Sequence, residues 1–454
     1  MSAGYFFNGR QWISPATMSR IDDSAMASQS LSVGNVAAFI GQSTGGQPNT
    51  PLIFGSPAQA KATLVGGELL QAVVKAFNPS NETGGPTTVV AIRVNPATQS
   101  SLVVNDAASV PSINLSSVDY GLRTNQIKVS FAAGSIKGVH ATTQLGSSVY
   151  SQDNLYAAPF SVQYTGPLAS AVMSISDTTV TLQAPTGNVV AAIDLATFPT
   201  VQQLVDNINS YANFTAAVLG GAGPQPALNG LDAVNLQDIK TAPYSVTATL
   251  QAVIGWLNSP AQSLVVATRA NGAGQPPAPL PFTYLTGGAD GVTTNQNWSD
   301  AFTTLQTVSV QWITPVTSNL TVAAMTDAHV QYMSTVGRNE RRAICGMALG
   351  TTDAEAIAAA LAINSDRTSL VHIGYYGYDL TGQLSGLQLY APYQTAAAIS
   401  GAFSGLDPGT PMTNKSLTFS GLERILLNPT NTDPLIQGGV LCVESTANGY
   451  KVVQ

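Results

Sequence analysis

The sequence predicts an α/β core with a mixed, partly parallel sheet flanked by helices, together with an inserted, mainly antiparallel β-rich domain and extended terminal arms. Three observations support this fold class. Short apolar runs alternate with segments of helical spacing towards both ends of the chain, as in α/β folds. The middle of the chain alternates apolar and polar residues between turn residues, as in antiparallel sheets. With 454 residues, the chain exceeds the size of a single hydrophobic core.

The N-terminal part divides at about residue 33. Residues 1–33 are polar and weakly periodic, so we expect an arm. Residues 34–96 are expected to form the first part of the core, because a short apolar run at 36–41 precedes a segment of helical spacing at 68–77. The β-branched run at 87–94 predicts a second, largely buried strand, which completes a strand–helix–strand unit.

The region 97–280 is expected to form the inserted β-rich domain. Its alternating runs are residues 127–131, 160–164 and 179–183. Two helices should interrupt the strands. Thr200 and Gln203 have the spacing of a capping box for the first helix, and residues 245–257 repeat apolar side chains at helical spacing. The Gly/Pro-rich stretch 271–281 predicts a linker.

The region 281–430 is expected to form the main α/β core, and residues 431–454 a C-terminal strand region. Strand-like segments lie at 308–313, 343–348 and 369–376, and helix-like segments at 322–336 and 354–363. Thr352 and Glu355 have capping-box spacing before the last of these helices. Such alternation predicts a sheet that is at least partly parallel.

The composition limits the possible function classes. Hydrophobic residues make up 44% of the chain, but charged residues only 9%, far below the roughly 25% of ordinary soluble domains. A secreted or β-rich protein with a neutral polar surface and a subunit that lives inside a polymer both fit this composition. The net charge of −7 provides no overall basic field, so we expect no direct binding of nucleic acid.

The N-terminus has neither a basic n-region nor an apolar h-region, and no run of 18 apolar residues occurs. We therefore expect a soluble protein that is made in the cytosol and does not insert into membranes. Cys345 and Cys442 each lie in an apolar stretch, so we expect buried thiols in preference to a disulfide.

A search for catalytic or ligand-binding chemistry finds little. His140, His329 and His372 are far apart in sequence and are expected to be structural. No metal-ligand spacing occurs, and no cofactor is expected. The segment Gly41–Gln47 superficially resembles a phosphate loop, but Gln47 stands where the lysine would be required, which favours a glycine turn after a strand.

One charged cluster stands out near residue 340, with a second candidate pair near residue 423. The first follows a predicted helix, so its basic residues have a simple explanation as partners of the negative helix end. The alternative is a role in contacts between subunits or with a tube, because bidentate arginine pairs suit repeated interfaces. The candidate inter-subunit or tube-facing charges are Arg338, Glu340, Arg341, Arg342, Glu423 and Arg424.

Several longer segments, taken in order, resemble the contractile tail sheath family of myophages and R-type tailocins. The N-terminal segments are 36–46, 54–60 and 90–94; the middle ones are 285–291 and 298–305; the C-terminal ones are 390–417, 421–426 and 435–444. The middle segment, Leu-Thr-Gly-Gly-Ala-Asp-Gly, is similar to the family's Gly-Gly-x-Asp-Gly sequence before the core. Its glycines permit a tight reversal, and Ser299 or Asp300 is expected to support the next helix start.

This resemblance implies a structural subunit of a virion, with no catalytic residues, no cofactor and no metal. It implies a six-start helical homo-oligomer around the tail tube protein, in contact with baseplate and neck or terminator proteins. The sheath would assemble in the host bacterial cytoplasm in an extended, high-energy state and contract by rigid-body movement of subunits tethered by arms. The β-rich insertion would face outward.

One difference from the family is that the sequence stops at Gln454, where relatives continue with further elements, so the C-terminal region is expected to be shortened. Another self-assembling structural protein, such as a surface-layer or fibre subunit, remains the alternative reading. A carbohydrate-active enzyme would need a carboxylate pair across a cleft, and no such pair can be singled out.

Overall fold

The computed structural model describes residues 5–7, 10–12, 36–407 and 410–453. The arm expected at residues 1–33 lies outside the described residues, apart from two short strands that pair antiparallel, β1 (Tyr5–Phe7) and β2 (Arg10–Trp12).

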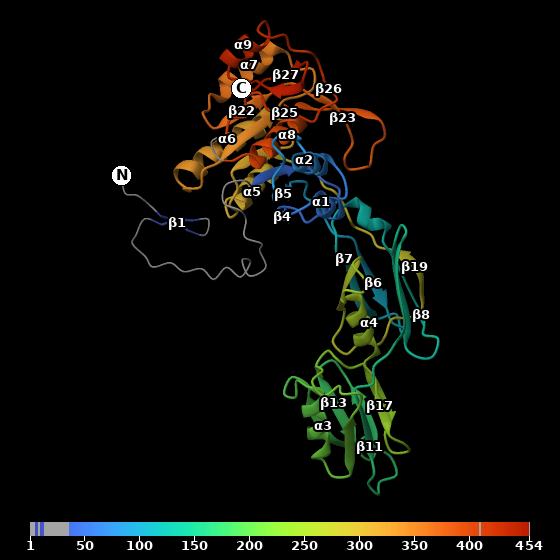
Figure 1. Ribbon diagram of the computed structural model, residues 1–454. Helices are drawn as coiled ribbons and strands as arrows, with labels where there is room; N and C mark the ends of the chain where they lie inside the picture. Colours follow the sequence, from blue (N-terminus) through green and yellow to red (C-terminus); the bar gives the residue numbers. More distant parts are fainter. Residues whose placement is uncertain (1–4, 8–9, 13–35, 408–409, 454) are drawn as a thin grey trace. The chain divides into compact units, whose positions relative to one another are not determined.

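The chain divides into two compact units (Figure 1). Unit 1 comprises Met1–Ala97 and Asp290–Gln454, and unit 2 comprises Thr98–Ala289. Unit 2 is thus an insertion in the sequence of unit 1.

Unit 1 is built on a six-stranded mixed sheet in the order β22-β21-β20-β3-β5-β4. All neighbouring strands are parallel except β4, which is an antiparallel edge strand. The strands are β3 (Ala37–Gly41), β4 (Pro51–Phe54), β5 (Val89–Arg93), β20 (Trp312–Pro315), β21 (Arg342–Gly346) and β22 (Thr368–Val371). Every residue of β3 and β5 is buried, which explains why both strands lack polar side chains apart from Arg93 at the end of β5.

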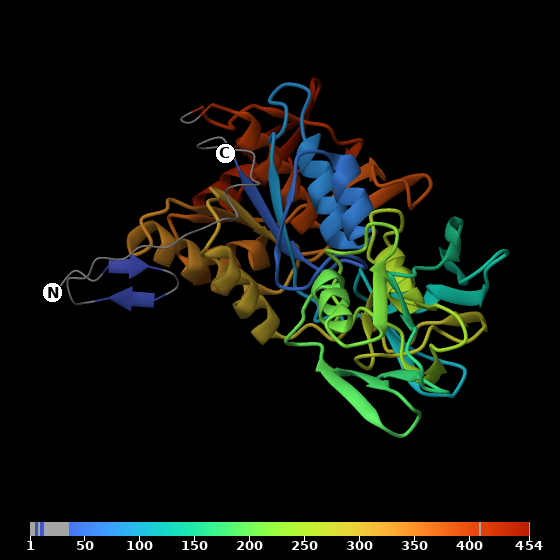
Figure 2. The same cartoon turned by 90° about the horizontal axis from the view of Figure 1, so that it is seen from below.

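Helices cover both faces of this sheet (Figures 1 and 2). Phe39 packs on the face covered by α2 and α8, with α1 beside α2, whereas Ile40 packs on the face covered by α5, α6 and α7. The helices are α1 (Pro57–Leu64), α2 (Glu68–Phe77), α5 (Asn295–Leu305), α6 (Leu320–Thr335), α7 (Asp353–Ile363), α8 (Pro392–Gly405) and α9 (Thr432–Gln437). The predicted capping box of Thr352 and Glu355 begins α7.

Two small antiparallel sheets complete unit 1. Their strand orders are β24-β23-β26 and β25-β28-β27. The strands are β23 (Tyr375–Tyr378), β24 (Leu387–Tyr390), β25 (Ser416–Leu417), β26 (Gly421–Leu422), β27 (Val443–Thr446) and β28 (Gly449–Val452). Hairpin β23–β24 faces a cavity beside α2.

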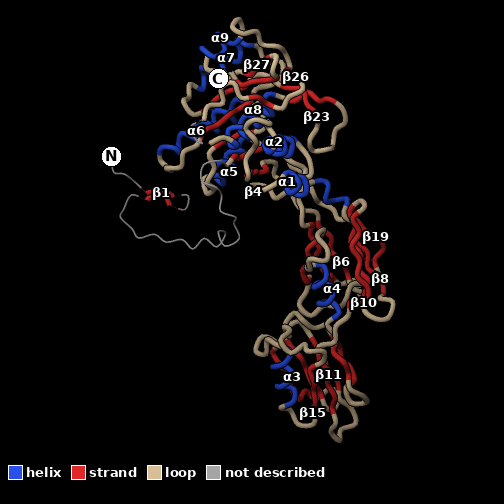
Figure 3. The backbone as a smooth tube through the Cα atoms, viewed as in Figure 1, coloured by secondary structure: helices blue, strands red, loops and turns tan. Residues whose placement is uncertain are grey.

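Unit 2 consists mainly of antiparallel sheets (Figure 3). These sheets enclose two separate hydrophobic cores. The first core lies between sheets β18-β7-β6 and β10-β9-β8-β19 and includes α4, and the second lies between sheets β15-β11-β17 and β14-β13-β12-β16 and includes α3. The first contains β6 (Ser101–Asn105), β7 (Pro111–Ser117), β8 (Lys128–Ala133), β9 (Val139–Leu145), β10 (Ser148–Leu155), β18 (Val265–Arg269), β19 (Leu280–Tyr284) and α4 (Thr249–Leu257). The second contains β11 (Phe160–Tyr164), β12 (Val172–Ile175), β13 (Thr179–Gln183), β14 (Val189–Asp194), β15 (Phe214–Val218), β16 (Val234–Asp238), β17 (Tyr244–Val246) and α3 (Val201–Asn209).

The structure corrects the helix expected at 245–257. Helix α4 begins only at Thr249, because Val246 belongs to strand β17 and pairs with Phe160. The first turn of α4 is capped by a distant carboxylate: Asp232 accepts hydrogen bonds from the backbone N–H groups of Thr249 and Leu250, at 2.8 and 3.0 Å. No capping residue lies next to the helix start in the sequence, so its position could not be read locally.

Three further expectations are corrected in unit 1. The run 369–376 is not one strand, because the chain passes from β22 to β23 at Gly374, where a Cβ atom would lie 2.4 Å from the carbonyl oxygen of Tyr390. Ser299 and Asp300 do not begin a helix but lie inside α5, which starts at Asn295 after a capping box of Thr294 and Asn297. The strand expected at 308–313 begins later, at Trp312, because turns that follow α5 extend to Val308.

Candidate functional site

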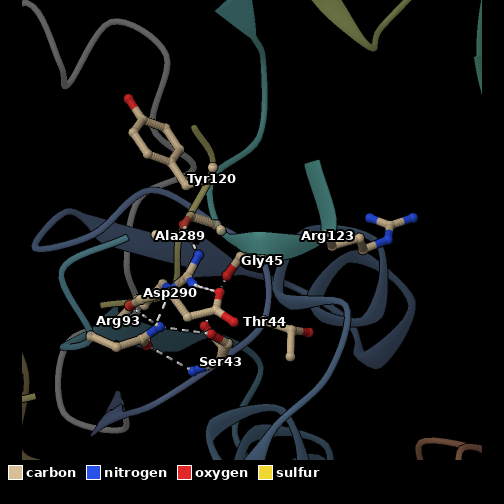
Figure 4. Close-up of polar contacts among 12 residues, drawn as sticks. Ser43, Thr44, Gly45, Arg93, Tyr120, Arg123, Ala289 and Asp290 are labelled. Atoms are coloured by element: carbon tan, nitrogen blue, oxygen red, sulfur yellow. Dashed lines mark hydrogen bonds and ion pairs between the residues drawn. The ribbon is translucent and has the colours of Figure 1, made fainter. Parts of the chain in front are cut away.

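A buried polar cluster of unit 1 lies at the carboxyl ends of β3 and β5, where the chain leaves for unit 2 and returns from it (Figure 4). Arg93, the last residue of β5, is fully buried. Its guanidinium donates to the carbonyl oxygen of Gly46 at 2.9 Å, to Oδ1 of Asn95 at 3.1 Å and to Oδ1 of Asp290 at 3.1 Å. The side chain thus joins a glycine loop to both connecting segments. We call this group of residues the junction cluster.

Asn95 completes the junction cluster with bonds on both sides. Its Nδ2 donates to the carbonyl oxygens of Ser43 and Asp290, at 3.2 and 3.1 Å, while its Oδ1 also accepts from the N–H of Ser43 at 3.2 Å. Next to Asp290, Gly291 has a φ of +70° and a Cβ there would lie 2.6 Å from the carbonyl oxygen of Pro96. A residue without a side chain is therefore required where the returning chain passes the departing one.

The glycine loop of this cluster is the segment that superficially resembles a phosphate loop. Its N–H groups serve the protein itself: Thr44 donates to the carbonyl of Gly66, and Gly45 to that of Leu64. Its carbonyl at Gly46 binds Arg93. The predicted glycine turn is confirmed, and this arrangement does not leave a ring of N–H groups directed at an anion.

Among the predicted charges, Arg341 lies in the interior of unit 1 and not at its surface. It is 1% exposed, and its guanidinium donates to the carbonyl oxygens of Leu305 (3.2 Å) and Val308 (2.6 Å) and to Nε2 of His329 (2.7 Å). Leu305 is the last residue of α5, and its carbonyl also accepts the N–H of Val308 at 3.1 Å, so the arginine adds a charged donor at the negative end of the helix. Burial lowers the pKa of Arg341 to about 10, which leaves it charged at neutral pH.

His329 accepts one of the hydrogen bonds of the buried Arg341 guanidinium. Burial and the neighbouring guanidinium lower the pKa of His329 to about 3, so the ring is neutral and its Nε2 can accept a hydrogen bond. The prediction that His329 is a structural residue on a helix agrees with its place in α6. The buried Arg341 cannot act as an exposed contact of this chain.

The other members of the first charged cluster are accessible. Arg338, Glu340 and Arg342 are exposed, and Glu340 forms an ion pair with Arg367 at 2.5 Å. Arg338 has a φ of +50°, which marks the turn between α6 and β21. For these three residues, a role in contacts between subunits remains a prediction.

Glu423 and Arg424 belong to a separate group at the start of α7. Glu423 accepts hydrogen bonds from the N–H groups of Gly350 and Gly374, at 2.6 and 2.9 Å. Arg424 pairs with Asp353, whose Oδ1 also lies 3.1 Å from Nε2 of the buried His372. Both residues therefore hold loops together, and their proposed role in contacts between subunits also remains a prediction.

The charges around Asp353 set two pKa values in this group. Although burial alone raises the pKa of Asp353, hydrogen bonds from Arg424 and Asn431 and the charge of Arg424 lower it below its ordinary value. Burial and then the charge of Arg424 lower the pKa of His372, so the imidazole is neutral at neutral pH.

An enzyme-like arrangement occurs on hairpin β9–β10 of unit 2. Nε2 of His140 lies 3.0 Å from Oγ of Ser151, and its Nδ1 lies 3.3 Å from Asp153. The imidazole is 39% exposed, so water competes for the bonds that would activate a hydroxyl. Asp153 also accepts from the N–H of Ser135, which ties the hairpin to a neighbouring turn. We assign these contacts to the stability of the hairpin.

Among residues 36–407 and 410–453, no three His, Cys, Asp or Glu side chains are grouped as a metal would require. No helix within these described residues has the length and apolar character needed to cross a membrane. Both cysteines are buried and free, which confirms that expectation.

Comparison with known proteins gives consistent results for sequence and fold. No protein-family model matches the sequence. The chain is 29% identical over 461 residues to the tail sheath protein of Bacillus phage SP01, with 98% of this chain and 78% of that protein covered. It is 27% identical to the putative tail sheath protein of Enterococcus phage phiEF24C (97% and 78% covered) and 24% identical to the tail sheath protein of Staphylococcus phage Twort (96% and 77% covered).

Solved structures show the same fold at lower identity. A sheath tail protein from Desulfitobacterium hafniense and one from Listeria innocua each give a TM-score of 0.54 at 11% identity. The matches cover 97% and 92% of this chain, and 74% and 68% of the respective structures. The resemblance predicted from the sequence segments is therefore confirmed: at least 96% of this chain is similar to three phage tail sheath proteins.

Proposed function

We propose that this chain is a structural subunit of the contractile sheath around a phage-type tail tube. The observation that carries the proposal is the similarity to three tail sheath proteins along at least 96% of the chain. The similarity to these proteins supports a virion component. In our proposal, the sheath is assembled in the host bacterial cytoplasm. The partners would be further copies of this chain in a six-start helix, the tail tube protein, and baseplate and neck or terminator proteins.

In this proposal, each subunit moves as a rigid body between an extended and a contracted lattice, and arms hold neighbouring copies together. The rearrangement of interfaces drives the tube through the host envelope, without an enzymatic reaction. Features of unit 1 support the rigid-body step. Its sheet is covered on both faces, and buried side chains such as Arg93 and Arg341 fix loops and a helix end to it. Close-packed interiors of this kind resist continuous deformation.

The low content of charged residues, 9%, also supports assembly, because few like charges oppose the approach of neighbouring copies. A surface-layer or fibre subunit would share this property, and it remains the alternative function.

Negative-stain microscopy of the purified chain tests the proposal over a range of protein and salt concentrations. Hollow tubes with helical striations are expected. Flat lattices or thin fibres would favour the alternative, and monomers at every concentration and salt level would contradict both.

A further inference from the structure

A small cavity in unit 1 lies beside helix α2 and hairpin β23–β24 and has a volume of about 150 Å³. Helix α2 contributes Lys75 to its wall, and the hairpin contributes Tyr375, Tyr378 and Leu380. Thr418, which precedes β26, closes another side. The wall therefore combines one cationic group with aromatic and apolar surface and with polar side chains such as Gln71 and Asn78.

Lys75 is only 6% exposed, yet no carboxylate pairs with it among the described residues. Its Nζ donates to the carbonyl oxygen and to Oγ1 of Thr418, at 2.6 and 3.0 Å. It lies 5.2 Å and 5.1 Å from the ring centroids of Tyr375 and Phe419, within the range of cation–π attraction. The ammonium group of Lys75 has three N–H donors, so one of them has no oxygen or nitrogen acceptor among the described residues.

Asp379, the one carboxylate on the wall of the cavity, is occupied by its own loop. It accepts hydrogen bonds from the N–H groups of Thr381, Gln383 and Leu384, each at 2.8 Å. Burial lowers the pKa of Lys75 to about 8, so the charged form still predominates at pH 7 but is disfavoured by the loss of water. A carboxylate placed in the cavity would supply both the missing acceptor and the missing countercharge.

The surroundings of the cavity are those of a protein interface. Small-molecule sites usually measure about 300–1,000 Å³, so a cavity of about 150 Å³ suits a single side chain better. The adjoining hairpin exposes large apolar side chains: Tyr378 at 67%, Leu380 at 40%, Leu384 at 49%, Leu387 at 50% and Leu389 at 39%. Apolar surface around a desolvated polar anchor is typical of the energetic centre of an interface.

We propose that this cavity receives an Asp or Glu side chain from a second copy of this chain. A second copy is favoured because the chain carries 24 acidic against 17 basic residues and therefore presents carboxylates in excess. This step rests on the proposed function, in which many copies contact one another. Neighbouring copies would place a carboxylate on Lys75 and cover the apolar side chains of hairpin β23–β24.

Zero-length carbodiimide coupling tests the proposal, because it joins an amine to a carboxylate only where the two are in contact. Polymer is assembled from an equal mixture of ¹⁴N- and ¹⁵N-labelled chains, coupled and digested for mass spectrometry. We expect Lys75 joined to an acidic peptide, with mixed isotope pairs that identify a link between copies. The pair Lys415–Glu82, 2.8 Å apart within one chain, is the positive control and should give unmixed isotope pairs.

The outcomes separate this inference from the proposed function. Polymer in which Lys415–Glu82 couples but Lys75 gives no mixed pair would overturn the inference and leave the sheath function standing. Failure of the chain to polymerise at all would contradict the sheath function and, with it, the second copy as occupant of the cavity.

A pair of variants provides an independent measurement. Lys75→Met keeps the length and apolar stem of the side chain, and Lys61→Met removes an exposed lysine from α1 as a control. We expect Lys75→Met to raise the concentration required for polymerisation about tenfold or more, as for the loss of one partner of a buried ion pair, and Lys61→Met to leave it unchanged. Hydrogen exchange of α2 in the monomer reports whether the variant is folded. A folded Lys75→Met chain that assembles at the wild-type concentration would refute the inference.

Discussion

Units 1 and 2 bury ionisable side chains of different kinds. Among the described residues, every buried Lys, Arg or His side chain lies in unit 1: Lys75, Arg93, His329, Arg341 and His372. The buried carboxylates, Asp106 and Asp232, both lie in unit 2.

The partners explain this difference. In unit 1, buried cations such as Arg341 bind backbone carbonyls, including those at the end of α5. In unit 2, buried carboxylates bind backbone N–H groups: Asp232 caps the start of α4, and Asp106 accepts from the N–H groups of Ala108 and Val110. Helices cover both faces of the parallel sheet in unit 1, and the long connections between its strands bury backbone carbonyls that need donors. In unit 2, buried backbone N–H groups of turns and of a helix start need acceptors instead.

The largest effect is expected for Arg341→Met. The variant removes the charged donor from the carbonyl of Leu305 and leaves the carbonyl of Val308 and Nε2 of His329 without their donor, so we expect unit 1 to lose about 3–5 kcal/mol of unfolding free energy. Hydrogen exchange of α5 and β21 peptides measures the loss. The exposed neighbour provides the control: Arg342→Met should change little, and unit 2 peptides should keep wild-type protection in both variants. If Arg341→Met and Arg342→Met lowered the protection of α5 and β21 equally, burial of Arg341 would not be the cause of its effect.

A pH experiment tests the neutral histidine beside that arginine. Because the folded-state pKa of His329 is about 3, below the ordinary 6.5, the unfolded chain binds a proton that the folded chain does not, and stability falls as the pH decreases from 6.5 towards 3. His329→Gln keeps an acceptor for Arg341 but cannot titrate. Between pH 6 and 4.5, wild-type unit 1 should lose about 2 kcal/mol more than the variant in urea unfolding. Parallel pH profiles would contradict a neutral, buried His329.

A smaller effect is expected in unit 2 for Asp232→Ala. The change removes the acceptor for the N–H groups of Thr249 and Leu250, so the start of α4 should lose about 1–2 kcal/mol of protection against exchange. Asp206→Ala, at an exposed position of α3, serves as the matched control and should behave like the wild type. If α5 and α6 in unit 1 lost protection as well, the two units would not be independent in stability.

The sequence predicted the elements whose signals are local. Helices α2, α3 and α7 occur where helical spacing or a capping box indicated them, because both signals lie within a few residues of the helix start. Antiparallel strands such as β11 and β13 were found from alternation. The start of α4 could not be predicted, because its cap, Asp232, is 17 residues away and its preceding strand pairs with Phe160.

The candidate sites were harder to predict than the elements. Arg93 and Asp290 each lay in a segment that resembles the sheath family, but neither was expected to pair with the other across 197 residues. The sequence offered two weak signals for this contact: Arg93 is the one charged residue of an apolar strand, and Asp290 is a carboxylate between glycine-rich neighbours. Arg341 and Arg342 are neighbours in sequence with identical chemistry, and only the packing of α5 and α6 against the sheet separates the buried one from the exposed one.

The two connections between the units have a consequence for how such proteins diversify. Within unit 2, Thr98 pairs with Ala289 and Ser101 with Thr286, so the departing and returning segments run side by side from the start. A replacement domain therefore needs only two neighbouring attachment points, and it leaves the strand order of the parental sheet unchanged. Because Arg93 and Asp290 both belong to unit 1, we expect their contact to persist when unit 2 is exchanged, enlarged or deleted as one module.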